Sequence, residues 1–214
     1  MRKDIKHPIG FYDYTVILTY VGLFLAVWGI FTAIDGKAGK SVFLLMWAGL
    51  CDMFDGAVAS TKKRNENEKF FGIQIDSLAD LVSFGVLPAV IAYTQSPIKQ
   101  ISCVIAALYI LAALIRLAYF NLLEENRQKS PSSAEKRYLG IPVTTIAVIM
   151  PVITVLYTMG IIANPTAFTI ALIPMGCGFL TPIEIKKPNI VGKVILLLLA
   201  VVEAVALFLS RSVM

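Results

Sequence analysis

The chain alternates long apolar runs with short polar connections, and the apolar runs determine its predicted structure. A helix needs about 20 apolar residues to cross the hydrocarbon core of a bilayer. Seven runs approach or reach that length: residues 15–34, 41–60, 71–95, 100–123, 140–162, 166–183 and 191–209. We therefore predict an all-α, polytopic bundle of about seven transmembrane helices. The number of spans lies between six and eight, because the run 166–183 contains residues that disfavour a helix: Pro174, Gly176, Gly178 and Pro182.

The composition is that of a membrane protein. Hydrophobic residues make up 57% of the 214 positions and charged residues 15%, whereas a soluble domain is usually about 25% charged. These values exclude an ordinary soluble enzyme, a disordered tail and a disulfide scaffold. The connections are short, so residues 1–214 are predicted to form one domain. Residues 1–13 mix apolar and charged side chains, which suggests an interfacial segment.

The basic residues indicate how the bundle is oriented. Cytoplasmic ends of membrane spans carry an excess of Lys and Arg. Of the 19 basic residues, most lie near the N-terminus, in the connections 61–69 and 124–139, and near residues 186–193. The opposite ends carry Lys37, Lys40, Lys99 and Arg211. The N-terminus is therefore predicted to be cytoplasmic, and seven spans would place the C-terminus outside.

Four aspartates lie inside the second and third predicted spans, where carboxylates are costly. An Asp at the centre of a spanning helix costs about 2.5–3.5 kcal/mol on insertion scales. These side chains must therefore face a polar cavity, pair with cations or bind metal. Asp52 and Asp55 are three residues apart, and Asp76 and Asp80 are four apart, so each pair shares a helix face. Both pairs lie near the same cytoplasmic turn and are predicted to face each other.

Small residues are predicted to let these two helices approach closely. They are Gly49, Gly56, Ala57 and Ala59 on one helix and Gly72, Ala79 and Gly85 on the other. Four carboxylates without Cys or His suit Mg²⁺ or Mn²⁺ more than zinc, and such a cluster can hold two ions. Paired divalent ions commonly clamp a phosphate during displacement at phosphorus. The pattern favours metal-dependent phosphoryl chemistry, and an ion path or a set of satisfied intramembrane carboxylates are the alternatives.

The aspartates belong to a longer motif. Asp52-Met-Phe-Asp55-Gly56-Ala-Val-Ala59 is followed by Gly72-Ile-Gln-Ile-Asp76-Ser-Leu-Ala-Asp80. This arrangement resembles the CDP-alcohol phosphatidyltransferase signature, which runs D-x-x-D-G-x-x-A-R and then G-x-x-x-D-x-x-x-D. Three further stretches resemble its phosphatidylserine synthase branch: Asp80-Leu-Val-Ser83-Phe-Gly85, Arg116-Leu-Ala-Tyr-Phe-Asn121 and Tyr138-Leu-Gly140-Ile-Pro142. The resemblance covers residues 45–150 approximately.

This chain departs from the family pattern in three respects, one of which is that the Asn-rich start of the family's first helix is not evident. The Arg that usually follows the alanine is Ser60 here, and the spacer of 11 residues between Ser60 and Gly72 is longer than usual. Lys62, Lys63 and Arg64 are the candidates to replace that Arg at the nucleotide.

The resemblance implies transfer of a phosphatidyl-type group from a CDP-linked lipid to L-serine, with release of CMP, at a site facing the cytoplasm. It implies two divalent cations, Mg²⁺ or Mn²⁺, on Asp52, Asp55, Asp76 and Asp80, with Asp80 also acting as general base. The residues assigned to the CDP moiety are Gly56, Ala59, Ser60, Lys62 and Gly72. A homodimer is implied by the resemblance alone, and no nucleic-acid partner is expected.

Arg116, inside the fourth predicted span, is the natural partner for the carboxylate of serine. A snorkelling side chain and a counter-ion to the aspartates are its alternative roles. Asn121 and Ser83 are further candidate serine contacts. The rival functions are a sibling transferase that uses glycerol phosphate or inositol phosphate, and an ion-coupled transporter. Glu203 has no assigned role, and a helix–helix hydrogen bond is expected for it.

Overall fold

The computed structural model describes residues 10–12, 14–129, 137–186 and 190–209. Helices account for most of these residues, so the predicted all-α class is confirmed. In chain order the elements are η1 (Tyr14–Val16), α1 (Ile17–Ile34), α2 (Ala38–Ala59), α3 (Glu66–Asp80), the π-helical η2 (Leu81–Val86), α4 (Leu87–Gln95), α5 (Lys99–Lys129), β1 (Arg137–Leu139), η3 (Val143–Thr145), α6 (Ile146–Thr158), α7 (Ala167–Leu180), β2 (Glu184–Lys186) and α8 (Ile190–Leu209). Residues 1–9 and 13 of the predicted interfacial segment lie outside the described residues.

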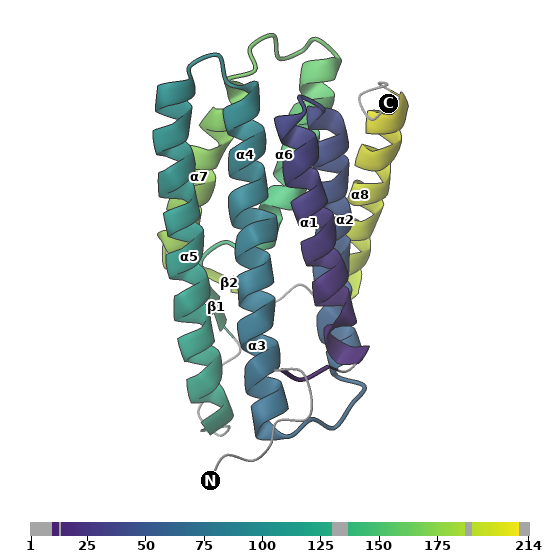
Figure 1. The fold of residues 1–214 in the computed structure, drawn as a ribbon, viewed down its shortest axis with the longest axis vertical. Coiled ribbons are helices and arrows are strands. Elements are labelled where there is room, and N and C mark those ends of the chain that lie inside the picture. Colours follow the sequence, from purple (N-terminus) through teal and green to yellow (C-terminus); the bar gives the residue numbers. More distant parts are fainter. Residues whose placement is uncertain (1–9, 13, 130–136, 187–189, 210–214) are drawn as a thin grey trace.

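The helices stand side by side along the long axis of the molecule (Figure 1). Helix α1 packs against α2, and α5 packs against α7. Helix α3 runs through η2 into α4 as one long rod, and α6 lies between α2, α7 and α8. The C-terminal ends of α2 and α5 and the N-terminal end of α3 lie together at the lower end of the bundle in Figure 1.

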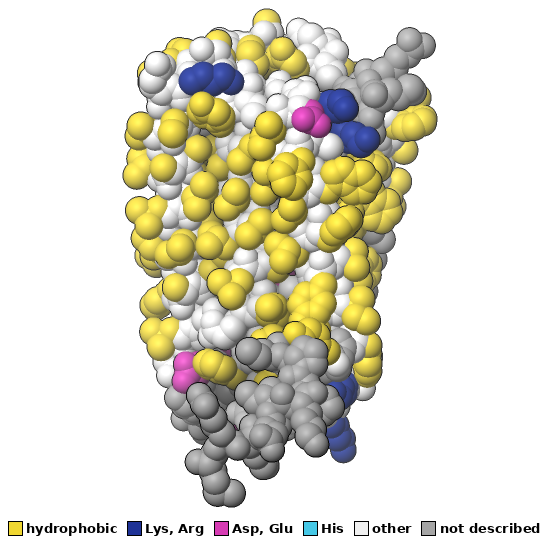
Figure 2. Space-filling view, in the orientation of Figure 1, with side chains coloured by type: hydrophobic (Ala, Val, Ile, Leu, Met, Phe, Trp, Pro, Cys, Tyr) yellow, Lys and Arg dark blue, Asp and Glu magenta, His cyan; other side chains and the backbone are white. Residues whose placement is uncertain are grey.

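Four helical segments are long and apolar enough to cross a membrane: Tyr14–Ile34, Ala38–Ala59, Glu66–Gln95 and Lys99–Asn126. Three shorter apolar helices, Val143–Thr158, Ala167–Leu180 and Leu198–Leu209, fall within the other predicted spans. Length and composition thus support four spans in the described part of the chain, and the count of seven stays a prediction. Large apolar side chains cover the middle of the surface, and charged ones lie toward the two ends (Figure 2). This distribution is typical of an integral membrane protein.

The run 166–183 forms a better helix than its composition predicts. Helix α7 continues without interruption through Pro174 and ends at Leu180, before Pro182. A proline removes a backbone donor, but close packing against α5 supports the helix here. A Cβ built at Gly176 would lie 3.7 Å from the Cα atom of Tyr109 on α5, an ordinary van der Waals distance, so α7 lies against the backbone of α5 here.

A short antiparallel pair, β1 with β2, was not expected from the sequence. Arg137 pairs with Lys186 and Leu139 with Glu184. Gly140 follows β1 with φ +79°, and a Cβ at this position would lie 2.8 Å from the carbonyl oxygen of Phe179. The strand pair and this tight turn join the segment after α5 to the segment after α7.

Glu203 departs from its expected role. Its side chain is buried on α8, and its two carboxylate oxygens make no hydrogen bond to the described residues. The expectation of a helix–helix hydrogen bond is therefore wrong for this part of the structure. The reason is that helices α6 and α8 pack mainly through apolar side chains, including Leu207, Ala200 and Ala204.

Candidate active site

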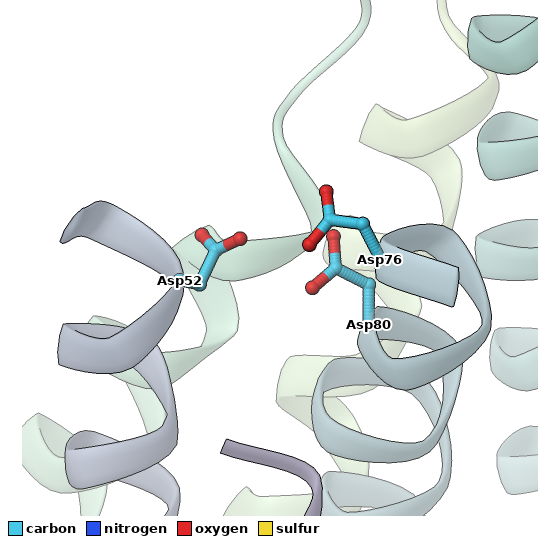
Figure 3. Close-up of side chains that lie close together, drawn as sticks. All are labelled: Asp52, Asp76 and Asp80. Carbon is cyan, nitrogen blue, oxygen red and sulfur yellow. The ribbon is translucent and has the colours of Figure 1, made fainter. Parts of the chain in front are cut away.

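Carboxylates from two helices meet near the lower end of the bundle. Each of Asp52 on α2 and Asp76 and Asp80 on α3 offers a carboxylate oxygen, and these three oxygens lie within 4.8 Å of one another. Figure 3 shows Asp52 reaching from its helix toward the other two. The prediction that the two helices present their aspartates to each other is confirmed for these three residues. We call them the acidic cluster.

Asp55 lies beside the acidic cluster instead of inside it. Its side chain is within hydrogen-bonding reach of Asp76 and interacts electrostatically with Asp52. Asp55 is three residues nearer the end of α2 than Asp52, so it lies about 4.5 Å closer to that end at 1.5 Å per residue. The four predicted carboxylates therefore form one group in which three lie closest together.

The spacing of the aspartates explains why they point the same way. Residues four apart share a face of a helix, so Gly72, Asp76 and Asp80 form a column along α3. The α-helix ends at Asp80, and the next residue begins the π-helical segment η2. Asp80 therefore stands at the junction between two helix types.

The small residues of the second and third predicted spans have different neighbours. A Cβ at Gly49 would lie 2.9 Å from the Cβ atom of Ala147 on α6, and one at Gly85 would lie 3.6 Å from that of Ala113 on α5. A Cβ at Gly56 would have no described atom within 4 Å apart from its own neighbours in the helix. The second and third predicted spans thus pack together where α2 meets η2 and α4, whereas α3 makes more contacts with α1 than with α2. Space for a ligand is thus available beside the aspartates.

The loop between α2 and α3 carries three cations and is fixed by its own hydrogen bonds. Asn65 Oδ1 accepts from the Glu68 backbone N–H at 2.8 Å, and Glu68 Oε2 accepts from the Asn65 N–H at 2.9 Å. This capping box starts α3. The Lys62 ammonium lies 3.4 Å from Glu68 Oε1. The Arg64 guanidinium lies over Gly72, where a Cβ would be 2.8 Å from its Nη1 atom.

The remaining residues predicted to contact CDP lie at the end of α2. Gly56 is exposed, Ala59 is half-buried, and Ser60 is exposed just after the helix. The Ser60 hydroxyl donates to the Ala57 carbonyl oxygen at 2.6 Å. All three therefore lie at the same end of the bundle as the acidic cluster and the Arg64–Gly72 contact.

Arg116 approaches the acidic cluster from α5. It is 9% exposed and interacts electrostatically with Asp80. This position agrees with the counter-ion role that the sequence left open. Burial argues against a snorkelling side chain, because a snorkelling Arg keeps its charged head in water.

The other two candidate serine contacts lie on different surfaces. Asn121 accepts a hydrogen bond from the Ser77 hydroxyl at 2.7 Å and donates to Gln74 Oε1 at 3.4 Å. Ser77 and Gln74 are on a different face of α3 from Asp76. Ser83 is buried inside η2, three residues after Asp80. The structure thus brings Arg116 to the acidic cluster, whereas Asn121 is engaged between α3 and α5.

The donor set of the acidic cluster fits a hard divalent cation. Carboxylate oxygens are the ligands that Mg²⁺ and Mn²⁺ prefer, and three of them within 4.8 Å can bind one ion together. Asp55, next to Asp76, can add a fourth donor. The fold and this site together define a helical membrane protein with a half-buried carboxylate centre suited to divalent metal.

The chain belongs to the CDP-alcohol phosphatidyltransferase family, whose sequence profile matches residues 15–182. It is 38% identical over 111 residues to CDP-diacylglycerol–serine O-phosphatidyltransferase of Saccharomyces cerevisiae, covering 50% of this chain and 38% of that protein. It is 30% identical over 164 residues to archaetidylserine synthase of Methanothermobacter thermautotrophicus, covering 76% and 64%.

A CDP-diacylglycerol–serine O-phosphatidyltransferase of Helicobacter pylori is 32% identical over 141 residues, covering 65% of this chain and 56% of that protein. The matched parts therefore span less than two thirds of each of these relatives. No solved structure matches the chain.

Proposed function

We propose that the protein transfers the phosphatidyl-type group of a CDP-linked lipid to the hydroxyl of L-serine. The serine oxygen forms a bond to the lipid phosphorus, the bond from that phosphorus to CMP breaks, and the serine proton moves to a carboxylate. The observation that carries this proposal is the acidic cluster, embedded in the family motif at the end of an apolar bundle. The serine and archaetidylserine names of its relatives support the choice of acceptor.

Asp52, Asp55, Asp76 and Asp80 would hold the two divalent cations. When bound, such ions neutralise the diphosphate and the leaving CMP. The aspartates themselves bring four negative charges into an apolar region, and this charge makes the site selective for cations. Arg116 offsets part of the charge through its electrostatic interaction with Asp80.

Asp80 is the proposed general base. A serine hydroxyl is a weak nucleophile at neutral pH and needs a base within hydrogen-bonding reach. Asp80 lies deepest along the column of aspartates on α3, so a small alcohol that enters past Asp76 would meet it last. Arg116, Asn121 and Ser83 are the proposed serine contacts, and Arg116 has the strongest support because it lies beside Asp80.

The CDP moiety is proposed to lie along Gly56, Ala59, Ser60, Lys62 and Gly72. Among the loop cations, Arg64 is the best placed to replace the Arg missing at Ser60. Its guanidinium lies over Gly72, in the column that continues to Asp76, whereas the Lys62 ammonium lies near Glu68. A planar guanidinium can also bind a phosphate through two hydrogen bonds.

For the whole chain we propose a single domain of seven spans with a cytoplasmic N-terminus and an active site facing the cytoplasm. The distribution of basic residues supports this orientation. We also propose a homodimer, which the family resemblance alone supports.

The test is release of CMP by the purified protein in lipid vesicles. A CDP-diacylglycerol and a CDP-linked isoprenoid ether lipid are each offered with serine, glycerol phosphate or inositol phosphate, with and without Mn²⁺. We expect CMP release that requires both serine and metal. The lipid that supports the faster release identifies the natural type of lipid chain. Release with glycerol phosphate or inositol phosphate instead would assign a sibling reaction, and the absence of release with every acceptor would refute the transferase function.

A further inference from the structure

The helix that carries Asp76 and Asp80 changes type directly after Asp80. Residues Leu81–Val86 form the π-helical segment η2, and α4 continues from Leu87. A π-helix pairs each N–H with the carbonyl five residues earlier, and such segments are rare and often lie at functional sites. The extra residue alters the rotation of α3 relative to α4, so the direction in which Asp76 and Asp80 point depends on this segment.

A side chain of α5 bonds to the backbone of η2. The Tyr109 hydroxyl donates to the carbonyl oxygen of Phe84 at 2.6 Å, and both residues are almost completely buried, at 2% and 1% exposure. The Tyr109 ring packs against Phe179 of α7 with 5.4 Å between centroids. Packing on both sides leaves this hydroxyl little freedom, so it holds η2 at a fixed distance from α5.

A second set of hydrogen bonds joins α5 to α3 below the first. The Ser77 hydroxyl donates to Asn121 Oδ1 at 2.7 Å, and Asn121 Nδ2 donates to Gln74 Oε1 at 3.4 Å. Gln74 and Ser77 flank Asp76 in sequence. Asp80 lies between Ser77 and Phe84, so Asp76 lies within the lower attachment to α5 and Asp80 lies between the lower and the upper one.

The acidic cluster needs such external support. Like charges that approach within a few ångströms repel each other, and α3 itself makes more contacts with α1 and α5 than with α2, which meets the rod mainly through η2 and α4. Few direct contacts between α2 and α3 are therefore available to oppose the repulsion between their carboxylates. The orientation of α3 has to come from its other neighbours, of which α5 forms the hydrogen bonds just described.

We propose that Tyr109 and Asn121 are positioning residues, which hold the α3–η2 rod at the rotation that brings Asp76 and Asp80 to Asp52. The proposal deepens the function proposed above, because the carboxylates that it positions are the metal ligands of that reaction. Asn121 then supports the acidic cluster, and its proposed contact with serine is the alternative that the experiments below decide. Tyr109 acquires a role that was not predicted from the sequence.

The central experiment compares Tyr109→Phe with Tyr119→Phe. The first removes the hydroxyl that bonds to Phe84 and keeps the ring. The second removes a hydroxyl from the same helix at a side chain that is 51% exposed. Mn²⁺ binding is measured by electron paramagnetic resonance on the purified protein without substrate, alongside the Mn²⁺ dependence of CMP release and the KM for serine.

We expect Tyr109→Phe to weaken Mn²⁺ binding by about tenfold, within the 10–100-fold range typical of residues that orient metal ligands. The KM for serine should change by less than about twofold at saturating metal, because Tyr109 makes no substrate contact. Tyr119→Phe should behave as the parent protein. Parent-like Mn²⁺ binding in a Tyr109→Phe protein that is folded by circular dichroism would overturn the proposal.

Ser77→Ala and Asn121→Ala test the lower attachment. Both remove the same hydrogen bond, so the double variant should weaken Mn²⁺ binding little more than Asn121→Ala alone. If Asn121→Ala instead raises the KM for serine and leaves Mn²⁺ binding unchanged, Asn121 is a substrate contact and its positioning role is wrong. Should Tyr109→Phe fail to fold, this pair decides the proposal through the same measurement.

Mn²⁺ binding separates this proposal from the proposed reaction. A parent protein that binds Mn²⁺ but releases no CMP with any acceptor refutes the transferase function, and the Tyr109 and Asn121 comparisons still decide the positioning role. A parent protein that binds no Mn²⁺ refutes both.

Discussion

Among single residues, Asp80 combines two roles. It belongs to the acidic cluster and lies beside Arg116, and it is also the proposed base. The amide of Asn is nearly the same size as the carboxylate and keeps one oxygen that can ligate a metal, but it cannot accept the serine proton. A substitution by Asn therefore separates ligation from proton transfer.

Asp80→Asn should lower kcat by about 10²–10⁴-fold, the usual contribution of a general base. Affinity for the CDP-lipid should fall less, because Asp52, Asp55 and Asp76 remain. The measurement is nucleotide-lipid binding and serine turnover on the same protein. Turnover that survives within a few fold would remove Asp80 from proton transfer, and equal losses in both would make it mainly a metal ligand.

Arg116→Lys should raise the KM for serine more than the KM for the CDP-lipid. A guanidinium pairs with a carboxylate through two hydrogen bonds, which a compact ammonium does not reproduce. Steady-state kinetics with each substrate varied in turn provide the check. An unchanged KM for serine would leave Arg116 as a counter-ion to Asp80.

Arg64→Ala should raise the KM for the CDP-lipid by about tenfold, since a hydrogen bond to a charged group is typically worth about 1.5–3 kcal/mol. Lys63→Ala is the matched control from the same loop and should have little effect. Gly72→Ala places a methyl group 2.8 Å from Arg64 Nη1 and should displace that side chain. Combining it with Arg64→Ala should therefore add little, and a fully additive loss would contradict the Arg64 assignment.

The sequence predicted the carboxylates well and their surroundings poorly. Helical spacing alone shows that Asp76 and Asp80 share a face, because that relation is local. The neighbours of Gly49 and Gly85 depend on how α5 and α6 pack. Such contacts join distant parts of the chain, and the spacing of residues along the sequence does not predict them. Asn121 was recognisable as a functional candidate, but its partners, Ser77 and Gln74, come from a distant segment.

At the scale of elements, long apolar runs predicted the positions of the helices because burial in a membrane follows composition. The π-helical η2 and the β1–β2 pair were not predictable. The first accepts a hydrogen bond from Tyr109 on another helix, and the second joins two segments more than 40 residues apart through backbone hydrogen bonds, so both involve contacts between distant parts of the chain. The continuity of α7 through Pro174 likewise depends on its contact with α5.

The turn after β1 offers a test at this scale. Gly140→Ala should lower the free energy of unfolding by more than Gly160→Ala does. Both glycines have positive φ, at +79° and +75°, a conformation that costs other residues roughly 1–2 kcal/mol. At Gly140 the new Cβ would also lie 2.8 Å from the Phe179 carbonyl oxygen, whereas Gly160 has no described atom within 4 Å.

Thermal unfolding in detergent measures this difference. A larger drop in Tm for Gly140→Ala supports the tight connection between the turn and α7. Equal drops for the two variants would show that the backbone conformation alone accounts for both.

At the scale of the whole molecule, the surface agrees with a bundle immersed in lipid. Apolar side chains surround its middle, and charged groups occur near both ends (Figure 2). Orientation rests on the excess of Lys and Arg in particular connections, which predicts that Lys63 is cytoplasmic and Lys37 is external.

Labelling with a membrane-impermeant maleimide tests this orientation in intact cells. Lys37→Cys should react from outside, and Lys63→Cys should react only after the membrane is permeabilised. The parent protein, whose Cys51, Cys103 and Cys177 lie in apolar helices, provides the background signal. The reverse pattern would place the acidic cluster on the outer side and refute the predicted orientation.

At Gly56, the residue that would most stabilise the fold differs from the residue that the proposed reaction would require. Glycine inside a helix costs roughly 0.5–1 kcal/mol relative to alanine, and a side chain here would meet no described atom within 4 Å. The fold alone would therefore gain from almost any small replacement. The proposed CDP site would account for a glycine here, because the substrate would occupy that space. On this proposal, a larger residue at position 56 should make the protein more resistant to heat and less active.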